Sequence, residues 1–193
     1  MIVLLSVVGV LLLLSVPYRI VCRRHRKRNR AVDFDGFLFS QNAPPFSTLR
    51  YGYFPASYNG CGVAATVNAS RILGRAVHPA DVISDFERFG AVLFGLFGTA
   101  SFAVTHYFRK KGFRVRTTLK RAEMEQAAKA APVSVLWYAH KRGGHFITLE
   151  PREEGFLAYN AGRRSGLVQI IPSLEEFLKQ RALFARLITI HDS

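Results

Sequence analysis

Three side chains that could do chemistry together stand in the order Cys61, His145 and Asn160. Cys61 follows the turn-forming pair Asn59-Gly60 and directly precedes about three helical turns of small and apolar residues. A cysteine at that place lies at the N-terminus of the predicted helix, where free backbone N–H groups and the helix dipole favour a thiolate. The sequence therefore indicates a helix that begins with a nucleophile.

A nucleophilic thiolate needs a base, and the base needs a partner that holds its ring. His145 begins a predicted strand at residues 145–150, and Asn160 ends the next one, at residues 155–160. We expect His145 to take the thiol proton, so that the pKa of the thiol falls well below the free value of about 8.5. Asn160 would fix the tautomer of the imidazole without adding charge.

Each of these residues also has an ordinary structural explanation. A single buried cysteine is usually a small core residue, a histidine can begin a strand, and an asparagine often forms a turn. The order and spacing of all three together favour a catalytic group. His140 is an alternative base, but it ends its own predicted strand before the turn, so His145 is preferred.

The elements that would position this group change type along the chain. The pattern up to residue 111 is helical, whereas from Phe113 apolar and polar residues alternate, as in half-buried strands. Helices followed by an antiparallel sheet predict an α+β domain. Helices are expected at residues 61–73, 78–89, 101–111, 120–130 and 173–180, and strands at 113–118, 133–140, 145–150, 155–160, 167–171 and 184–191.

The motifs around these residues resemble those of papain-like cysteine peptidases. Within that group the chain is most similar to the peptidase domains that remove double-glycine leaders from bacteriocin precursors, and to their stand-alone relatives. The likeness rests on Asn59-Gly60-Cys61-Gly62, Gly144-His145-Phe146, Tyr159-Asn160 and Gly95 to Thr99, and it extends from Phe54 to His191.

This resemblance implies a papain-like fold and hydrolysis of peptide bonds, with Cys61 as nucleophile, His145 as base and Asn160 as its partner. The substrate would be a peptide or protein, processed as a leader peptide, and a transporter would be the partner. Two other functions stay open: an acyltransferase or transglutaminase-like enzyme that uses the same three residues, and a non-catalytic peptide-binding homologue.

One position departs from the family pattern. Those peptidases carry a glutamine six residues before the cysteine, which donates a hydrogen bond to the oxyanion, and here that position is Pro55. Asn59 and Tyr58 are the candidate replacements.

The first 30 residues differ from the rest. Met1–Cys22 is apolar until Arg19 and long enough to cross a bilayer, at about 1.5 Å per residue, so residues 1–22 are predicted to be a transmembrane anchor. The alternative is a signal peptide, but no basic residue precedes the apolar run and no small-x-small cleavage site follows it.

The basic run Arg23–Arg30 predicts contact with anionic lipid and a domain on the cytoplasmic side, in a bacterial inner membrane. Residues 23–53 form a juxtamembrane segment and linker, and residues 54–193 form the peptidase-like domain.

Composition excludes several classes. Of 193 residues, 49% are apolar, which argues against disorder and allows a core of ordinary size. Cys22 and Cys61 do not make a disulfide framework, and neither a cofactor nor a metal is expected. Half of the net charge of +14 comes from residues 19–30, so the remainder is only mildly basic and a nucleic-acid partner is not expected.

Overall fold

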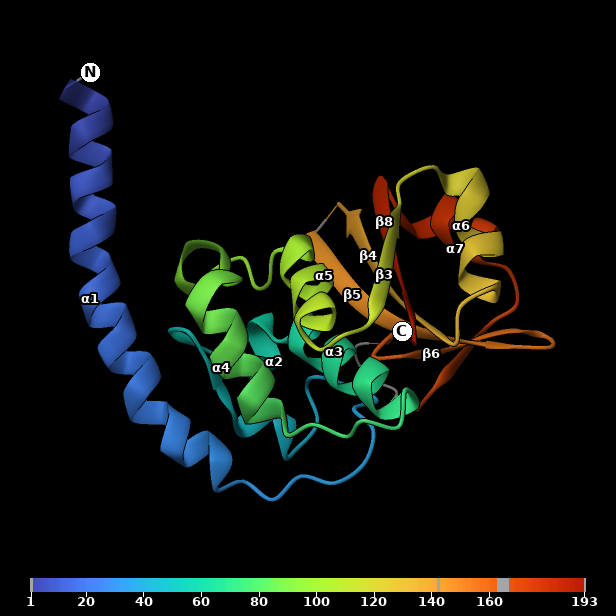
Figure 1. Cartoon of the computed structure of the whole chain (residues 1–193), viewed down its shortest axis with the longest axis horizontal. Coiled ribbons are helices and arrows are strands. Elements are labelled where there is room, and N and C mark those ends of the chain that lie inside the picture. The colour runs from blue at the N-terminus through green and yellow to red at the C-terminus, as the bar shows by residue number, and fades with distance from the viewer. Residues whose placement is uncertain (1, 142, 163–166, 193) are drawn as a thin grey trace.

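A six-stranded antiparallel sheet lies between two groups of helices (Figure 1). The computed structural model describes residues 2–141, 143–162 and 167–192, with side chains from residue 15 onward. The strand order is β3–β8–β4–β5–β6–β7. The strands are β3 (Arg114–Thr118), β4 (Val133–His140), β5 (Gly143–Arg152), β6 (Gly155–Tyr159), β7 (Gln169–Ile171) and β8 (Phe184–His191).

Two hydrophobic clusters fill the two faces of this sheet. Helices α3, α4 and α5 pack on one face, over apolar residues of β3, β4, β5 and β8. Helices α6 and α7 pack on the other face. The helices are α1 (Ile2–Arg30), α2 (Ala56–Asn59), α3 (Cys61–Ile72), α4 (Pro79–Phe89), α5 (Ser101–Lys110), α6 (Arg121–Lys129) and α7 (Leu174–Arg181).

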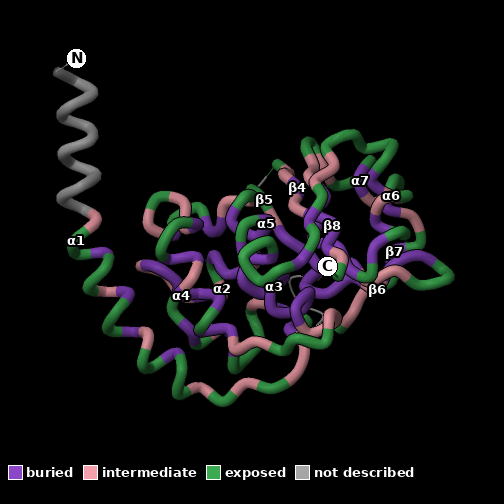
Figure 2. The backbone as a smooth tube through the Cα atoms, viewed as in Figure 1, coloured by how far each residue is buried: buried purple, intermediate pink, exposed green. Residues whose placement is uncertain are grey.

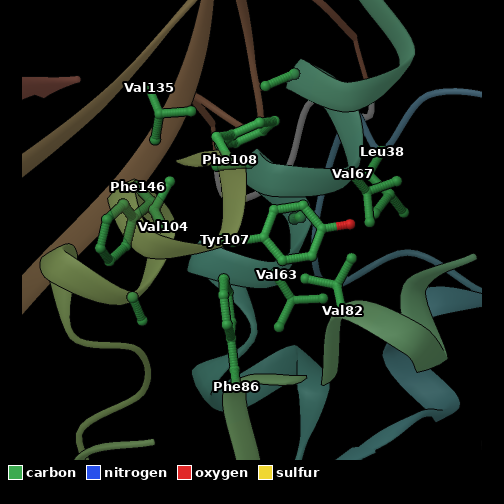
Figure 3. Packing of buried hydrophobic residues seen from close by; sticks show 14 of the residues in the cluster. Leu38, Val63, Val67, Val82, Phe86, Val104, Tyr107, Phe108, Val135 and Phe146 are labelled. Carbon is green, nitrogen blue, oxygen red and sulfur yellow. The ribbon is translucent and has the colours of Figure 1, made fainter. Parts of the chain in front are cut away.

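Helix α3 is the central helix because it is buried nearly all round. Gly62 to Ser70 are all buried (Figure 2), and Val63 and Val67 belong to the same hydrophobic cluster as the aromatic residues of α4 and α5 (Figure 3). The other side of α3 lies on the sheet, where the Thr148 hydroxyl donates to the Ala65 carbonyl at 2.9 Å. Small residues allow this approach on both sides, which fixes the position of the first residue, Cys61.

The α+β class is confirmed, and the predicted strands and helices agree with the structure to within a few residues. The sequence did not reveal the short elements that precede α3. These are the 3₁₀ turn η1 (Phe46–Thr48), the hairpin of β1 (Arg50–Tyr51) and β2 (Phe54–Pro55), and helix α2. The 3₁₀ turn η2 (Val92–Gly95), which follows α4, was not predicted either. The predicted loop at 161–166 falls mostly outside the described residues.

Residues 31–45 cross the surface of the domain as a strap. Leu38 makes two backbone hydrogen bonds with the Asn68 carboxamide of α3, at 2.7 and 2.8 Å. Phe37 and Phe39 stack on Tyr159 at the end of β6. The aromatic residues of the predicted linker therefore hold the linker against the domain. Some of them pack in the core and others make contacts at the surface.

Helix α1 runs without a break through the boundary that was predicted between residues 22 and 23. Its second half packs on α4 and β1, and the Asn29 carboxamide bonds the backbone N–H and C=O of Arg50 at 3.0 and 2.7 Å. The predicted anchor depends on side chains at 1–14, which lie outside the described ones. Among the described residues, no helix is both long and apolar enough to cross a bilayer.

The strap gives a test of this packing. Asn68→Ala should lower the free energy of unfolding by roughly 2–4 kcal/mol, because two buried backbone groups of Leu38 lose their partner. Arg71→Ala is the matched control on the same helix. It removes an ion pair with the exposed Asp35 of the strap and a contact with the Phe37 ring, and it should cost about 1 kcal/mol or less. Denaturant unfolding of the full chain measures both, and equal losses would contradict the assigned role of Asn68.

Candidate active site

Cys61, His145 and Asn160 all line one cleft of about 1070 Å³. They come from the start of α3, the start of β5 and the residue after β6. The structure therefore brings together the three residues that the sequence singled out, from positions up to 99 residues apart. His140 lines the same cleft.

The cleft exists because two strands separate. The pairing of β5 with β6 ends at Thr148 and Tyr159, so the part of β5 before Thr148 lies next to α3 and the Asn160 turn instead. Phe146 uses its backbone groups there. Its N–H faces the Cys61 sulfur, and its C=O accepts from the Asn160 amide at 3.3 Å.

Cys61 is the first residue of α3 and is half-buried. Burial raises the pKa of the Cys61 thiol, and hydrogen bonds from the backbone N–H groups of Phe146, Gly62 and Cys61 itself offset this only in part. This differs from the expected lowering of the thiol pKa. The helix N-terminus does supply donors, but loss of water around the sulfur outweighs them in the free protein.

His145 is oriented by the backbone of Asn160. Its Nε2 lies 2.7 Å from the Asn160 carbonyl oxygen. A carbonyl only accepts, so Nε2 carries a hydrogen, and in the neutral ring Nδ1 is then the basic nitrogen. Asn160 was expected to orient the ring through its carboxamide, whereas the contact in the structure is made by its main chain.

Asn160 suits this role because of its backbone conformation. Its φ is +59°, in the left-handed region that asparagine tolerates better than most residues with a Cβ. Its buried carboxamide fixes that turn: Oδ1 accepts from the Gln41 backbone N–H at 2.9 Å, and Nδ2 donates to Phe146. The side chain therefore holds the turn, and the turn presents the carbonyl to His145.

Gln41 is a residue of the cleft that sequence reasoning missed. It lies on the strap, bonds Asn160 through its backbone, and donates from Nε2 to the Ser57 carbonyl at 2.8 Å. Its position far before the cysteine hid it. The one hint in the sequence is that Gln41 lies in a stretch with too many aromatic residues for a free linker. Such a stretch is expected to pack on the domain.

The two candidate oxyanion donors have different surroundings. The Asn59 amide nitrogen donates to the carbonyls of Tyr51 and Gly95, at 3.1 and 2.6 Å, so both its hydrogens face the β1 and η2 segments. Asn59 is therefore a buried residue that links the β1 and η2 segments. The prediction that its side chain is an oxyanion donor is wrong. Tyr58 lines the cleft and is 60% exposed.

Comparison with known proteins identifies the fold. No protein-family model and no curated protein matches the chain. The peptidase domain of Streptococcus ComA, a bifunctional ABC transporter involved in a quorum-sensing pathway, matches with a TM-score of 0.53 and 14% identity, over 74% of this chain and 97% of that domain. A double-glycine-motif protease from an AMS/PCAT transporter, in complex with the leader peptide, matches with a TM-score of 0.46 and 14% identity, over 69% and 84%. Pseudomonas AvrPphB matches with a TM-score of 0.38 and 12% identity, over 70% and 92%. With the helices, the sheet and the cleft described above, the chain has the papain-like peptidase fold.

Proposed function

We propose that this protein is a membrane-anchored cysteine peptidase that hydrolyses peptide bonds with Cys61, His145 and Asn160. The observation that carries the proposal is that these three residues line one open cleft, with the His145 ring held by Asn160. A cleft of about 1070 Å³ has room for several residues of an extended peptide.

The chemistry begins from a neutral pair, because burial keeps the proton on the Cys61 thiol in the free protein. As the sulfur attacks the substrate carbonyl carbon, His145 takes the thiol proton on Nδ1. The Nε2–H bond to the Asn160 carbonyl stabilises the resulting imidazolium. The backbone N–H of Cys61 donates to the oxyanion, with Tyr58 as the side-chain donor at the rim. His145 then protonates the leaving amine, and water hydrolyses the thioester.

The substrate is proposed to be a leader peptide, with a transporter as partner. Two matched proteins are transporter peptidase domains, and one of them was solved with a leader peptide. Acyl transfer to an amine is the alternative use of the same residues. Hydroxylamine distinguishes the two: rapid hydroxamate formation at the expense of hydrolysis would favour transfer.

A non-catalytic peptide-binding homologue is the second candidate function. Two observations favour it: Pro55 stands where the family has its oxyanion glutamine, and burial raises the pKa of the Cys61 thiol. In that case the cleft would bind peptide equally well after Cys61→Ala, and no covalent adduct would form.

An electrophilic peptide probe tests the proposal. Labelling of Cys61 should fall about 10²–10⁴-fold in His145→Ala, because the base is lost. His140→Ala is the matched control from the same cleft and should retain most of the labelling. Because the thiol pKa is raised, wild-type labelling should keep increasing above pH 8.5. Labelling that survives His145→Ala but not His140→Ala would overturn the assignment of the base, and no labelling of any variant would favour the non-catalytic candidate.

The backbone role of Asn160 predicts an unusual order of variants. Asn160→Gly should label roughly 5- to 30-fold faster than Asn160→Ala, because glycine adopts the left-handed conformation without the roughly 1–2 kcal/mol that alanine loses. Both variants lose the carboxamide, so any difference reports the carbonyl that holds His145. Equal rates in the two variants would contradict the role assigned to the backbone conformation of Asn160.

The anchor and its orientation are part of the same proposal. We propose that the apolar start of α1 crosses the inner membrane of a bacterium and that the Arg23–Arg30 run contacts anionic lipid, with the domain in the cytoplasm. The full chain should then sediment with membranes and resist extraction by alkaline carbonate, whereas a variant with Leu11→Arg and Leu13→Arg should be extracted. Release of the wild-type chain by carbonate would contradict the anchor.

A further inference from the structure

A second group of reactive side chains lies where α1 packs on α4. Cys22 and His25 are three residues apart on α1 and so share one face of it, and Glu87 is on α4. Their exposed fractions are 4, 6 and 8%. The sulfur, a ring nitrogen and a carboxylate oxygen lie within 4.8 Å of one another. None of the three lines the cleft that holds Cys61.

We propose that Cys22, His25 and Glu87 bind one divalent transition-metal ion, for which zinc is the best match. Thiolate, imidazole and carboxylate are the ligand types of zinc sites, whereas magnesium and calcium prefer oxygen ligands throughout. Three protein ligands leave the fourth tetrahedral position for water. A pocket of about 600 Å³ lined by Tyr18, Cys22 and Glu87 gives water access to it.

Tyr18 lies beside the proposed ligands and contacts one of them. It lies one turn before Cys22 on α1 and is only 7% exposed. Its buried hydroxyl interacts with the side chain of Cys22 and can donate to the sulfur. With Cys22 bound to the ion as a thiolate, this hydroxyl would be an outer-shell donor of the kind that orients metal ligands.

Glu87 is already oriented toward His25. Its Oε1 lies 2.7 Å from the His25 Nε2 and accepts from the Gly52 backbone N–H at 3.0 Å. On metal binding, the ion would take the place of the hydrogen between His25 Nε2 and the carboxylate, and the neutral ring would carry its hydrogen on Nδ1 instead. The Gly52 backbone N–H, which donates to the same oxygen, limits the movement of the carboxylate, so little rearrangement is required.

The proton and charge balance of this site is simple. The Cys22 S–H bond breaks, its proton goes to solvent and a sulfur–metal bond forms, with no electron transfer. The thiolate and the Glu87 carboxylate then neutralise the dication, so the buried centre carries no net charge. Arginines line the adjoining pocket and oppose a free cation, but they have little effect on a neutral centre. They are Arg19, Arg23, Arg26 and Arg88.

Such an ion would fasten α1 to the peptidase domain. It would join Cys22 and His25 to Glu87, at least 62 residues later in the chain. Because the unfolded chain cannot present these ligands together, binding would stabilise the folded protein.

Cobalt and zinc titrations test the site. The full chain, purified in detergent and stripped with a chelator, should bind one equivalent of Co²⁺ with thiolate charge-transfer and tetrahedral absorption bands, which Zn²⁺ abolishes. Cys22→Ser should remove the charge-transfer band. His25→Gln and Glu87→Gln should weaken zinc affinity by more than the roughly 10- to 100-fold typical of outer-shell changes. Cys61→Ser is the matched control and should bind like wild type.

Two results would overturn the site. One is a thiolate band that survives Cys22→Ser but disappears in Cys61→Ser, which would put the metal in the cleft. The other is no binding by wild-type protein whose circular dichroism shows it folded. Alkylation of Cys22 in the Cys61→Ser background gives a second readout: zinc should slow it at least about tenfold, and an unchanged rate would reject the proposal. Neither readout depends on peptidase activity.

Discussion

The early end of the β5–β6 pairing is the constraint on which the cleft depends. Beyond Thr148 and Tyr159 the two strands have no shared ladder, so the backbone of Phe146 is available to α3 and to Asn160. Buried backbone groups must have partners, and here those partners are the Cys61 sulfur and the Asn160 turn that holds the His145 ring. The same gap leaves room for a substrate, and sheet and site are therefore parts of one arrangement.

Helix α3 and the strap fix the two sides of that gap. The small residues of α3 let it lie close to both the sheet and the α4–α5 pair (Figure 3). This packing fixes the position of Cys61, the first residue of α3. The strap carries Gln41 to Asn160 through the Leu38–Asn68 bonds. Residues of the strap, which precede the Cys61 motif in the sequence, therefore form part of the cleft, although they contribute no proposed reacting group.

The sequence predicted well what periodicity and residue type determine. The alternation from Phe113 onward and the small residues after Cys61 led directly to the sheet and to α3. Prediction from the sequence failed where the site depends on contacts made by backbone groups that are distant along the chain. The Asn160 carbonyl, and not its carboxamide, faces His145, and the Asn59 amide is taken by two carbonyls. The position of Gln41 and the burial around Cys61 depend on how the strap folds back, which no local pattern records.

A crystal structure of the Cys61 adduct with a peptide aldehyde would test the central claim most directly. The measured quantities are the distances from the His145 Nδ1 to the Cys61 sulfur and from its Nε2 to the Asn160 oxygens. Our account predicts a hydrogen-bond distance from Nδ1 to the adduct, with Nε2 retained on the Asn160 carbonyl. A ring turned away from Cys61, or held by the Asn160 carboxamide, would contradict it.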